Sequence, residues 1–244
     1  MTTVMQAANV GGIPVQAFAS QAECARNILD DARHARGGFA VAINAEKVVT
    51  CLRDRAMSDI VSHATLRYPD GAGVVVAMRL KGFQSARVAG ADLWLEILEQ
   101  ARDQRVSAAL IGASPEVLAA TRARLAREFP NLEVRFAADG FAGARDAASV
   151  AQRLIATRPE LIFVAMGSPR QEALITELRR HHPQGFYLGL GGSFDIYSGA
   201  KRRAPRWMQQ AGLEWLFRFL CEPSRARRET KRLKFLFMLA AGRL

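Results

Sequence analysis

The stretch "LIFVAMGSPRQE", residues 161–172, contains a strand pattern, a turn and the start of a helical pattern. Its apolar first half is typical of a strand that is buried on both faces of a parallel sheet. Ser168 and Pro169 follow, and these residue types favour the N-cap and the first position of a helix. The stretch "SAALIGASPE", residues 107–116, repeats this order. We therefore predict an α/β fold with parallel strands.

Apolar runs and helical patterns alternate along the first 200 residues. This alternation predicts βαβ units, in which a helix connects one parallel strand to the next. We expect a mostly parallel sheet flanked by helices. The predicted strands are residues 39–43, 64–68, 107–112, 132–137, 161–167 and 186–192. The predicted helices between them include residues 92–104, 115–128, 146–156 and 169–181.

The positive charge of the chain is concentrated near its C-terminal end. The formal net charge is +11. From Lys201 onward there are twelve Lys or Arg residues and three Glu residues, a net charge of +9, which leaves +2 for the first 200 residues. This last segment has helical patterns and no further strand pattern. We therefore predict two parts, an α/β core over residues 1–199 and a basic helical appendage over residues 200–244.

Residues 222–240, "EPSRARRETKRLKFLFMLA", place six basic residues before an apolar run. A basic amphipathic helix of this kind favours binding to an anionic membrane surface. Two alternatives stay open on the pattern alone, a helix that packs on a partner subunit and a contact with nucleic acid. We expect no nucleic-acid partner, because the segment has neither helix-turn-helix spacing nor an aromatic platform for bases.

Several function classes lack their sequence signatures. The N-terminus has no basic region followed by an apolar run, and no apolar run reaches the roughly 18 residues of a spanning helix, so we expect neither a signal peptide nor a transmembrane helix. The three cysteines lie far apart, which favours a reducing compartment. There is no P-loop and no Asp-x-Asp pair, and the four histidines form no cluster. We therefore expect no metal ion and no cofactor, with phosphate groups bound by cations and helix N-termini.

Asp70 lies in the turn "PDG", between a predicted strand and a predicted helix. These residue types are common turn formers, so the pattern supports a turn residue. The carboxyl ends of parallel strands are also where α/β folds bind ligands. Asn44, in "AINAEKV", has a similar pair of interpretations, as an N-cap or as an amide that faces a ligand. In "RVAGADLW" three residues either begin a helix or contact a ligand: Arg87, Gly90 and Asp92.

Cations near two predicted helix starts suggest phosphate binding. Arg170 lies in the first turn of a helix, where a positive charge opposes the helix dipole unless an anion is bound nearby. Gln171, beside it, is a second candidate contact. The run "KRRAPRW", residues 201–207, places four cations around a helix start. It is either a solvated charge run or a site for bidentate phosphate binding.

Seven stretches of the chain together resemble the WecG/TagA/CpsF glycosyltransferases, from about Val15 to the C-terminus. They are "AINAEKV", "PDG", "RVAGADLW", "VAMGSPRQE", "GLGGSFDIYSGAKRRAPRW", "GLEWLFR" and "EPSRARR". The combination of "AINAEK", "RVAGADLW" and "VAMGSP" is most similar to the WecG branch. The resemblance implies a Rossmann-like core and an inverting, metal-independent transfer of N-acetyl-D-mannosaminuronate from UDP to undecaprenyl-diphosphate-linked N-acetylglucosamine, in the synthesis of enterobacterial common antigen or a related polymer.

The resemblance also implies roles for individual residues. Asp70 matches the proposed general base of the family, and Asn44 and Gln171 match positions near the donor. We expect the donor site to comprise Asn44, Gly90, Asp92, Gly112, Gly167, Ser168, Arg170, Gln171 and Gly191. The appendage arginines that match candidates for the acceptor diphosphate are Arg203, Arg206, Arg225 and Arg228.

The implied acceptor is a sugar linked by a diphosphate to a polyprenyl lipid. We therefore expect a peripheral protein at the cytoplasmic face of the inner membrane. Relatives that use N-acetylmannosamine tend to carry Thr two positions before the motif Asn, where this chain has Ala42, so the donor stays open. Within the family the alternative is another UDP-hexose, N-acetylmannosamine or glucose, in teichoic acid, capsule or exopolysaccharide synthesis.

Two function classes outside the family fit the sequence less well. A nucleotide-dependent oxidoreductase requires a G-x-G-x-x-G motif after the first strand, and this chain has none there. A non-enzymatic nucleotide- or membrane-binding protein would explain the basic tail but not the motif-rich, nearly neutral core. A homo-oligomer is possible on the sequence, since Trp215 and Phe219 are apolar positions that could form a subunit contact.

Overall fold

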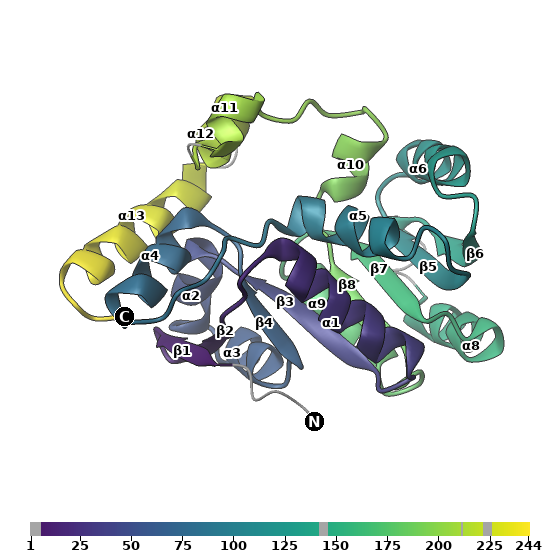
Figure 1. Ribbon diagram of the computed structural model, residues 1–244, viewed down its shortest axis with the longest axis horizontal. Helices are drawn as coiled ribbons and strands as arrows, with labels where there is room; N and C mark the ends of the chain where they lie inside the picture. Colours follow the sequence, from purple (N-terminus) through teal and green to yellow (C-terminus); the bar gives the residue numbers. More distant parts are fainter. Residues whose placement is uncertain (1–5, 142–145, 211, 222–225) are drawn as a thin grey trace.

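The computed structural model describes residues 6–141, 146–210, 212–221 and 226–244. These residues form a six-stranded sheet flanked by helices, together with a two-stranded hairpin (Figure 1). The strands are β1 (Ala7–Val10), β2 (Ile13–Gln16), β3 (Gly38–Ile43), β4 (Leu66–Pro69), β5 (Val106–Gly112), β6 (Leu132–Ala138), β7 (Leu161–Ala165) and β8 (Phe186–Gly189). The helices are α1 (Gln21–Arg33), α2 (Ala45–Cys51), α3 (Arg55–Ser62), α4 (Ala72–Leu80), α5 (Gly90–Gln100), α6 (Pro115–Glu128), α8 (Ala147–Thr157), α9 (Arg170–Leu178), α10 (Ser193–Tyr197), α11 (Arg206–Gln210), α12 (Glu214–Cys221) and α13 (Ala226–Ala240).

The six-stranded sheet is parallel throughout, in the order β4-β3-β8-β7-β5-β6. The prediction of a mostly parallel α/β sheet flanked by helices is confirmed, and the architecture is Rossmann-like. All six predicted strands exist, although their ends differ by up to three residues. The strand predicted over residues 186–192 ends at Gly189, because the next residues turn into α10.

Two hydrophobic clusters cover the two faces of this sheet. β7 shows the division: Leu161 and Phe163 belong to one cluster, and Ile162 and Val164 belong to the other. Successive side chains of a strand point to opposite faces, so burial on both sides produces a continuous apolar run. The first cluster includes residues of α1, α5, α6 and α10, and Figure 1 shows α1 crossing in front of the sheet. The second includes residues of the hairpin and of α2, α3, α4, α8, α9 and α13.

The two Ser-Pro turns begin their helices differently. Ser114 caps α6 as predicted, because its side chain accepts a hydrogen bond from Val117 N at 3.4 Å. The same prediction for Ser168 is wrong. α9 begins at Arg170 with Pro169 as its N-cap and no side-chain cap. Four residues connect β7 to α9, whereas two connect β5 to α6, so Ser168 precedes the N-cap instead of occupying it.

The segment after α10 runs over the carboxyl ends of the strands and then returns to the sheet. Figure 1 shows α11 and α12 away from the sheet and α13 beside α2 and α4. Phe235 of α13 is fully buried, and a Cβ atom on Gly73 would lie 3.0 Å from its ring. α13 therefore shares a hydrophobic cluster with the sheet. None of the helices in the described part of the chain has the length and apolar character needed to cross a membrane.

Candidate active site

A cavity of about 1270 Å³ opens along the carboxyl ends of the strands, and residues that follow each of the six strands of the sheet line it. One wall is polar and consists of the turns that follow these strands. The opposite wall is largely apolar and comes from two helices of the C-terminal segment, α12 and α13. The side chains of this apolar wall are Trp215, Leu216, Phe217, Phe219, Leu233, Phe235 and Leu236.

Asp70 and Asn44 lie side by side on the polar wall. In the parallel pair β3–β4, Ile43 is opposite Pro69, so the next residue of each strand is Asn44 and Asp70. Asp70 N–H also donates to Ile43 O at 2.8 Å. Gly71 then adopts a φ of +127°, which side-chain-bearing residues rarely adopt, so this turn depends on glycine. The predicted place of Asp70, in a turn at the carboxyl end of a strand, is confirmed.

Asn44 caps a helix, as one interpretation of its motif predicts, and it also lies at the cavity. Its Oδ1 accepts a hydrogen bond from Lys47 N at 2.9 Å and so caps α2. Its Nδ2 group donates to no described residue, and Asn44 lines the cavity. A cap uses only the oxygen of the amide, so the nitrogen can donate to a ligand.

The start of α5 lies next to the Asp70 carboxylate. A Cβ atom on Gly90 would lie 3.0 Å from Tyr68 Oη and 4.0 Å from Asp70 Oδ2. Tyr68 is buried, and burial, followed by the negative charge of Asp70, raises the Tyr68 pKa well above its usual range. The phenol therefore stays neutral at physiological pH. The N-terminus of α5 attracts negative charge, so this corner of the cavity suits an ionised carboxylate.

Two arginines of the cavity have no ionic partner in the described part of the chain, Arg170 and Arg202. Arg170 is the first residue of α9, is exposed and lines the cavity together with Gly167 and Ser168. Arg202 is exposed and lines the cavity from the segment between α10 and α11. An unpaired guanidinium beside a helix N-terminus is well suited to bind a phosphate group.

Gln171 is part of the cavity wall, and most of its side chain is buried in that wall. It is only 6% exposed. Its Oε1 accepts from Gly191 N at 2.8 Å, and its Nε2 donates to Glu172 Oε1 at 3.2 Å. Glu172 in turn forms a buried ion pair with Lys47. Both ends of the Gln171 amide are therefore used inside the protein.

Arg203 and Asp92 were expected to bind different substrates, but they form an ion pair with each other. The pair is bidentate, with Arg203 Nη2 at 2.7 Å from Asp92 Oδ2. The hydrogen bond that Arg203 donates to Asp92 is the main cause that raises the Arg203 pKa above its usual value. Arg203 Nε also lies 3.6 Å from Glu214 Oε1, and Glu214 Oε2 lies 3.8 Å from Arg87 Nη2. These charges connect the segment after α10 to α5 and to the chain that precedes it.

The cavity brings together most of the expected donor residues. Those that line it are Asn44, Gly90, Gly167, Ser168, Arg170, Gln171 and Gly191, and Asp70, the expected base, lines it with them. Among the lining residues that the structure describes, Asp92, Gly112, Arg203 and Arg206 do not occur. Arg225 lies outside the described residues, and Arg228 lies in α13 without a described side chain.

Sequence reasoning missed several residues of this cavity. Lys47 lines it, and so do Glu214 and the aromatic residues of α12, whereas Arg202 lines it from the basic run that was a candidate for phosphate binding. Lys47 and its partner Glu172 are separated by 125 positions, so no local pattern connects them. The motifs "AINAEKV" and "VAMGSPRQE" contain both residues. In each motif a charged residue follows a predicted helix start, and this was the signal that could have identified the pair of Lys47 and Glu172.

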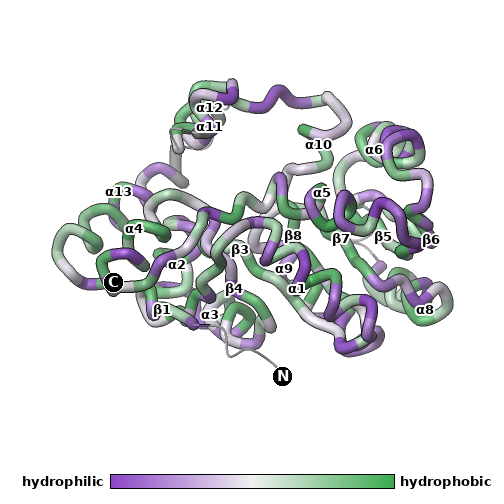
Figure 2. The backbone as a smooth tube through the Cα atoms, in the orientation of Figure 1, coloured by the Kyte–Doolittle hydropathy of each residue, from purple (hydrophilic) through white to green (hydrophobic). Residues whose placement is uncertain are grey.

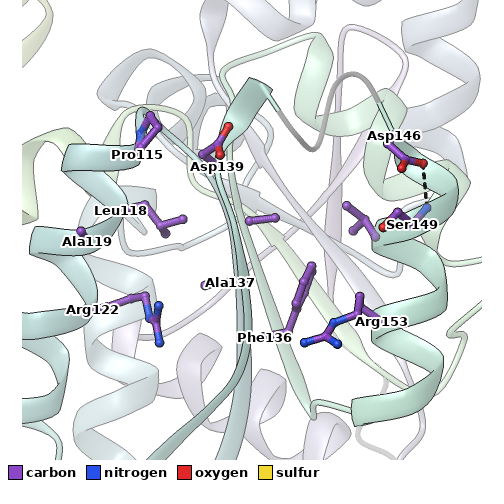
Figure 3. A pocket seen from close by; sticks show the side chains of 12 residues that line it. Pro115, Leu118, Ala119, Arg122, Phe136, Ala137, Asp139, Asp146, Ser149 and Arg153 are labelled. Carbon is purple, nitrogen blue, oxygen red and sulfur yellow. Dashed lines mark hydrogen bonds between the residues drawn. The ribbon is translucent and has the colours of Figure 1, made fainter.

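A second cavity, of about 460 Å³, lies at the outer edge of the sheet. Figure 3 shows it around β6, with Leu118 and Arg122 of α6 on one side and Ser149 and Arg153 of α8 on the other. None of the catalytic, donor-binding or acceptor-binding residues predicted from the sequence lines this cavity. Over the part of the chain that the structure describes, no group of three His, Cys, Asp or Glu side chains is placed to hold a metal ion.

A family model described as "Glycosyl transferase WecG/TagA/CpsF family" matches residues 8–244. The match covers nearly the whole chain. It includes the strand ends of the polar wall and the two helices of the apolar wall. It also includes the N-terminal hairpin, which lies before the stretches that showed the resemblance in the sequence.

Proposed function

Because the chain belongs to the WecG/TagA/CpsF glycosyltransferase family, we propose that it transfers N-acetyl-D-mannosaminuronate from UDP to undecaprenyl-diphosphate-linked N-acetylglucosamine. One observation carries the proposal beyond the family. Asp70, Asn44 and Arg170 surround a single cavity of about 1270 Å³ at the carboxyl edge of a parallel sheet. This edge is where α/β folds bind nucleotides, and the volume is ample for a nucleotide sugar.

Asp70 is the proposed general base. The acceptor hydroxyl must lose a proton as its oxygen attacks the anomeric carbon of the donor, and a carboxylate within hydrogen-bond distance accepts that proton. Attack from the face opposite the leaving UDP inverts the configuration at this carbon. The position of Asp70 beside the start of α5 supports the role, because the helix N-terminus favours the ionised carboxylate.

Arg170 is the proposed partner of the donor diphosphate. As the bond to the sugar breaks, negative charge grows on the departing UDP, and a fixed cation lowers the energy of that state. Arg170 has no partner among the described residues, and it lies at the start of α9. The N-terminus of a helix carries partial positive charge, so the start of α9 attracts the same diphosphate. This arrangement supports a transfer that needs no metal ion.

The apolar wall and the outer face of α13 are proposed to meet the membrane that holds the acceptor. Leu233 and Phe237 of α13 are 67% and 68% exposed, and Trp207 and Leu220 are also largely exposed. Figure 2 shows hydrophobic stretches in α12 and α13 and a hydrophilic stretch between α10 and α11. Apolar side chains flanked by basic residues are typical of a helix that lies at a membrane surface. The apolar wall and Asp70 line the same cavity, so a membrane-bound acceptor would enter beside this wall.

The proposal is tested by mass spectrometry of the reaction product. The enzyme is incubated with a short-chain lipid diphosphate that carries N-acetylglucosamine and, in separate reactions, with UDP-N-acetylmannosaminuronate, UDP-N-acetylmannosamine and UDP-glucose. We expect a product only, or by far fastest, with the uronate. A product with a neutral sugar alone would contradict the donor, and no product with any UDP-sugar would contradict the proposed function as a whole.

A further inference from the structure

A chain of polar contacts joins three neighbouring strand ends at the floor of the cavity. β8 lies between β3 and β7 in the sheet. α2 follows β3 and α9 follows β7, so the first turns of these helices stand on either side of the turn after β8. Lys47 of α2 pairs with Glu172 of α9, and Gln171 binds the backbone of Gly191 in that turn.

The Lys47–Glu172 pair is poorly explained by folding stability alone. Lys47 is 7% exposed and Glu172 is 1% exposed. Removing both charges from water is unfavourable, and apolar residues of similar volume often give equal or greater stability. Glu172 Oε2 is also buried without a hydrogen-bond partner in the part of the chain that is described, which adds to the cost. A different role therefore has to account for this pair.

The pair determines how the Gln171 amide is oriented. The Gly191 N–H can only donate, so it requires Gln171 Oε1, which lies 2.8 Å away. The ionised Glu172 carboxylate can only accept, so it requires Gln171 Nε2, which lies 3.2 Å away. Lys47 supplies the opposite charge that this buried carboxylate needs. Gln171 Nε2 also packs against Gly189, where a Cβ atom would lie only 2.5 Å from it.

We propose that Lys47 and Glu172 are positioning residues for the donor-binding wall. They orient Gln171, Gln171 holds the Gly191 N–H, and the turn from Gly189 to Ser193 lines the cavity in which the UDP-sugar binds. Glu172 does not line the cavity itself, so it acts through Gln171. This inference rests on the proposed function, because it requires that UDP occupies this cavity.

The main test replaces the ion pair with apolar residues. In the double variant Lys47→Met/Glu172→Leu no unpaired charge is left buried, so we expect a thermal unfolding midpoint equal to or above that of the wild type. Without its partner, Gln171 no longer holds the turn. We expect the dissociation constant for UDP, measured by titration calorimetry, to rise about tenfold to a hundredfold, because small displacements of binding groups have effects of this size. The KM for the lipid acceptor should not change.

Gln171 gives an independent arm of the test. Gln171→Met leaves the ion pair in place and removes only the contact with Gly191, so we expect the same loss of UDP affinity. In the triple variant the losses should not add, because all three residues act through one turn. Losses that add in the triple variant would overturn the proposal. So would wild-type UDP affinity in the folded double variant.

Controls separate this effect from general damage. Arg36→Met/Asp31→Leu removes an ion pair just before β3, at the opposite end of the sheet, and should leave UDP affinity unchanged. If the double variant does not fold, Gln171→Met carries the test by itself, and normal UDP affinity in that folded variant would contradict the proposal. Failure of the proposed function is seen separately, as a wild-type enzyme that neither binds UDP nor uses any UDP-sugar.

Discussion

Asp70 shows how one turn can serve both the fold and the chemistry. It is held by a backbone hydrogen bond to Ile43 and followed by a glycine with a φ of +127°. The same turn places its carboxylate beside the start of α5 and in the wall of the cavity. At the scale of single residues, the proposed function therefore predicts different effects for substitution of Asp70, the proposed base, and of Arg170, the proposed partner of the diphosphate.

Asp70→Asn is expected to lower kcat by about 10²- to 10⁴-fold, because the amide cannot accept the proton of the acceptor hydroxyl. The dissociation constant for UDP should stay near the wild-type value, since the volume and shape of the side chain are kept. Steady-state kinetics and titration calorimetry measure the two quantities. Asp103→Asn, an exposed carboxylate after α5, is the matched control and should behave as the wild type. Near-normal turnover of Asp70→Asn would show that another group takes the proton.

Arg170→Met is expected to raise the KM for the UDP-sugar about tenfold or more, because it removes a charged hydrogen bond to the diphosphate. Added salt should weaken UDP binding to the wild type more than to the variant, since exposed charges are screened. Arg127→Met, an exposed arginine of α6, is the control. An unchanged KM in Arg170→Met would direct attention to Arg202, the other unpaired arginine of the described cavity wall.

At the scale of elements, α13 has two opposite apolar faces. Phe235 faces the second hydrophobic cluster, whereas Phe237 is exposed on the outside of the helix and Leu233 and Leu236 are exposed where α13 borders the cavity. The inner face explains why α13 lies against α2, and the outer face is the proposed membrane contact. The apolar run "FLFML" thus contributes one residue to the core and others to the proposed membrane contact, and the sequence pattern alone could not separate them.

Leu233→Ser/Phe237→Ser is expected to reduce binding to anionic phospholipid vesicles without lowering the thermal unfolding midpoint. Each exposed apolar side chain loses the free energy of insertion into the membrane, about 1.5–3 kcal/mol if it is fully buried there. Vesicle co-sedimentation measures the effect. Ile155→Ser, an exposed apolar residue of α8, is the control. Unchanged sedimentation of the double variant would remove the support for this face as the membrane contact.

The segment between α10 and α12 is connected to the core by charge. Arg203 contacts Asp92 with both terminal nitrogens and approaches Glu214, so it is not free to bind a diphosphate in this arrangement. Arg203→Met is expected to increase the rate of proteolysis between α10 and α12, because it leaves both carboxylates without this partner. Limited proteolysis followed by mass spectrometry measures the cleavage rate. Arg243→Met, an exposed cation near the C-terminus, is the control, and equal cleavage rates would show that the ion pair does not fasten this segment.

At the scale of the whole molecule, the C-terminal helix is part of the folded core. Phe235 is fully buried against Gly73 of α4, in the same cluster as residues of β3 and β7. Phe235→Ala is therefore expected to lower the free energy of unfolding by about 3–5 kcal/mol, measured by urea denaturation. A loss well below 1 kcal/mol would mean that α13 packs independently of the sheet. Truncation before α13 removes this side chain as well, so point variants test membrane binding more cleanly.

The N-terminal hairpin shows a signal that sequence reasoning overlooked. β1 and β2 are joined by Gly11 and Gly12, and a Gly-Gly pair between short apolar stretches is typical of a two-residue hairpin turn. Ala8, Val10 and Val15 are buried against the second face of the sheet. The alternation of buried and exposed residues was therefore present, but the strands have only four residues each.

The sequence by itself determined the parallel α/β sheet and the place of Asp70 and Asn44 at its carboxyl edge. The sheet and the place of these two residues can be predicted because consecutive residues encode each apolar strand, the turn after it and the capped helix that follows. Only the tertiary structure decided which charges are available. Arg203 forms an ion pair with Asp92, and Gln171 donates a hydrogen bond to Glu172. Lys47 pairs with Glu172, which lies 125 positions away in the sequence. Ion pairs form between side chains that folding brings together, so they leave no periodic pattern in the sequence.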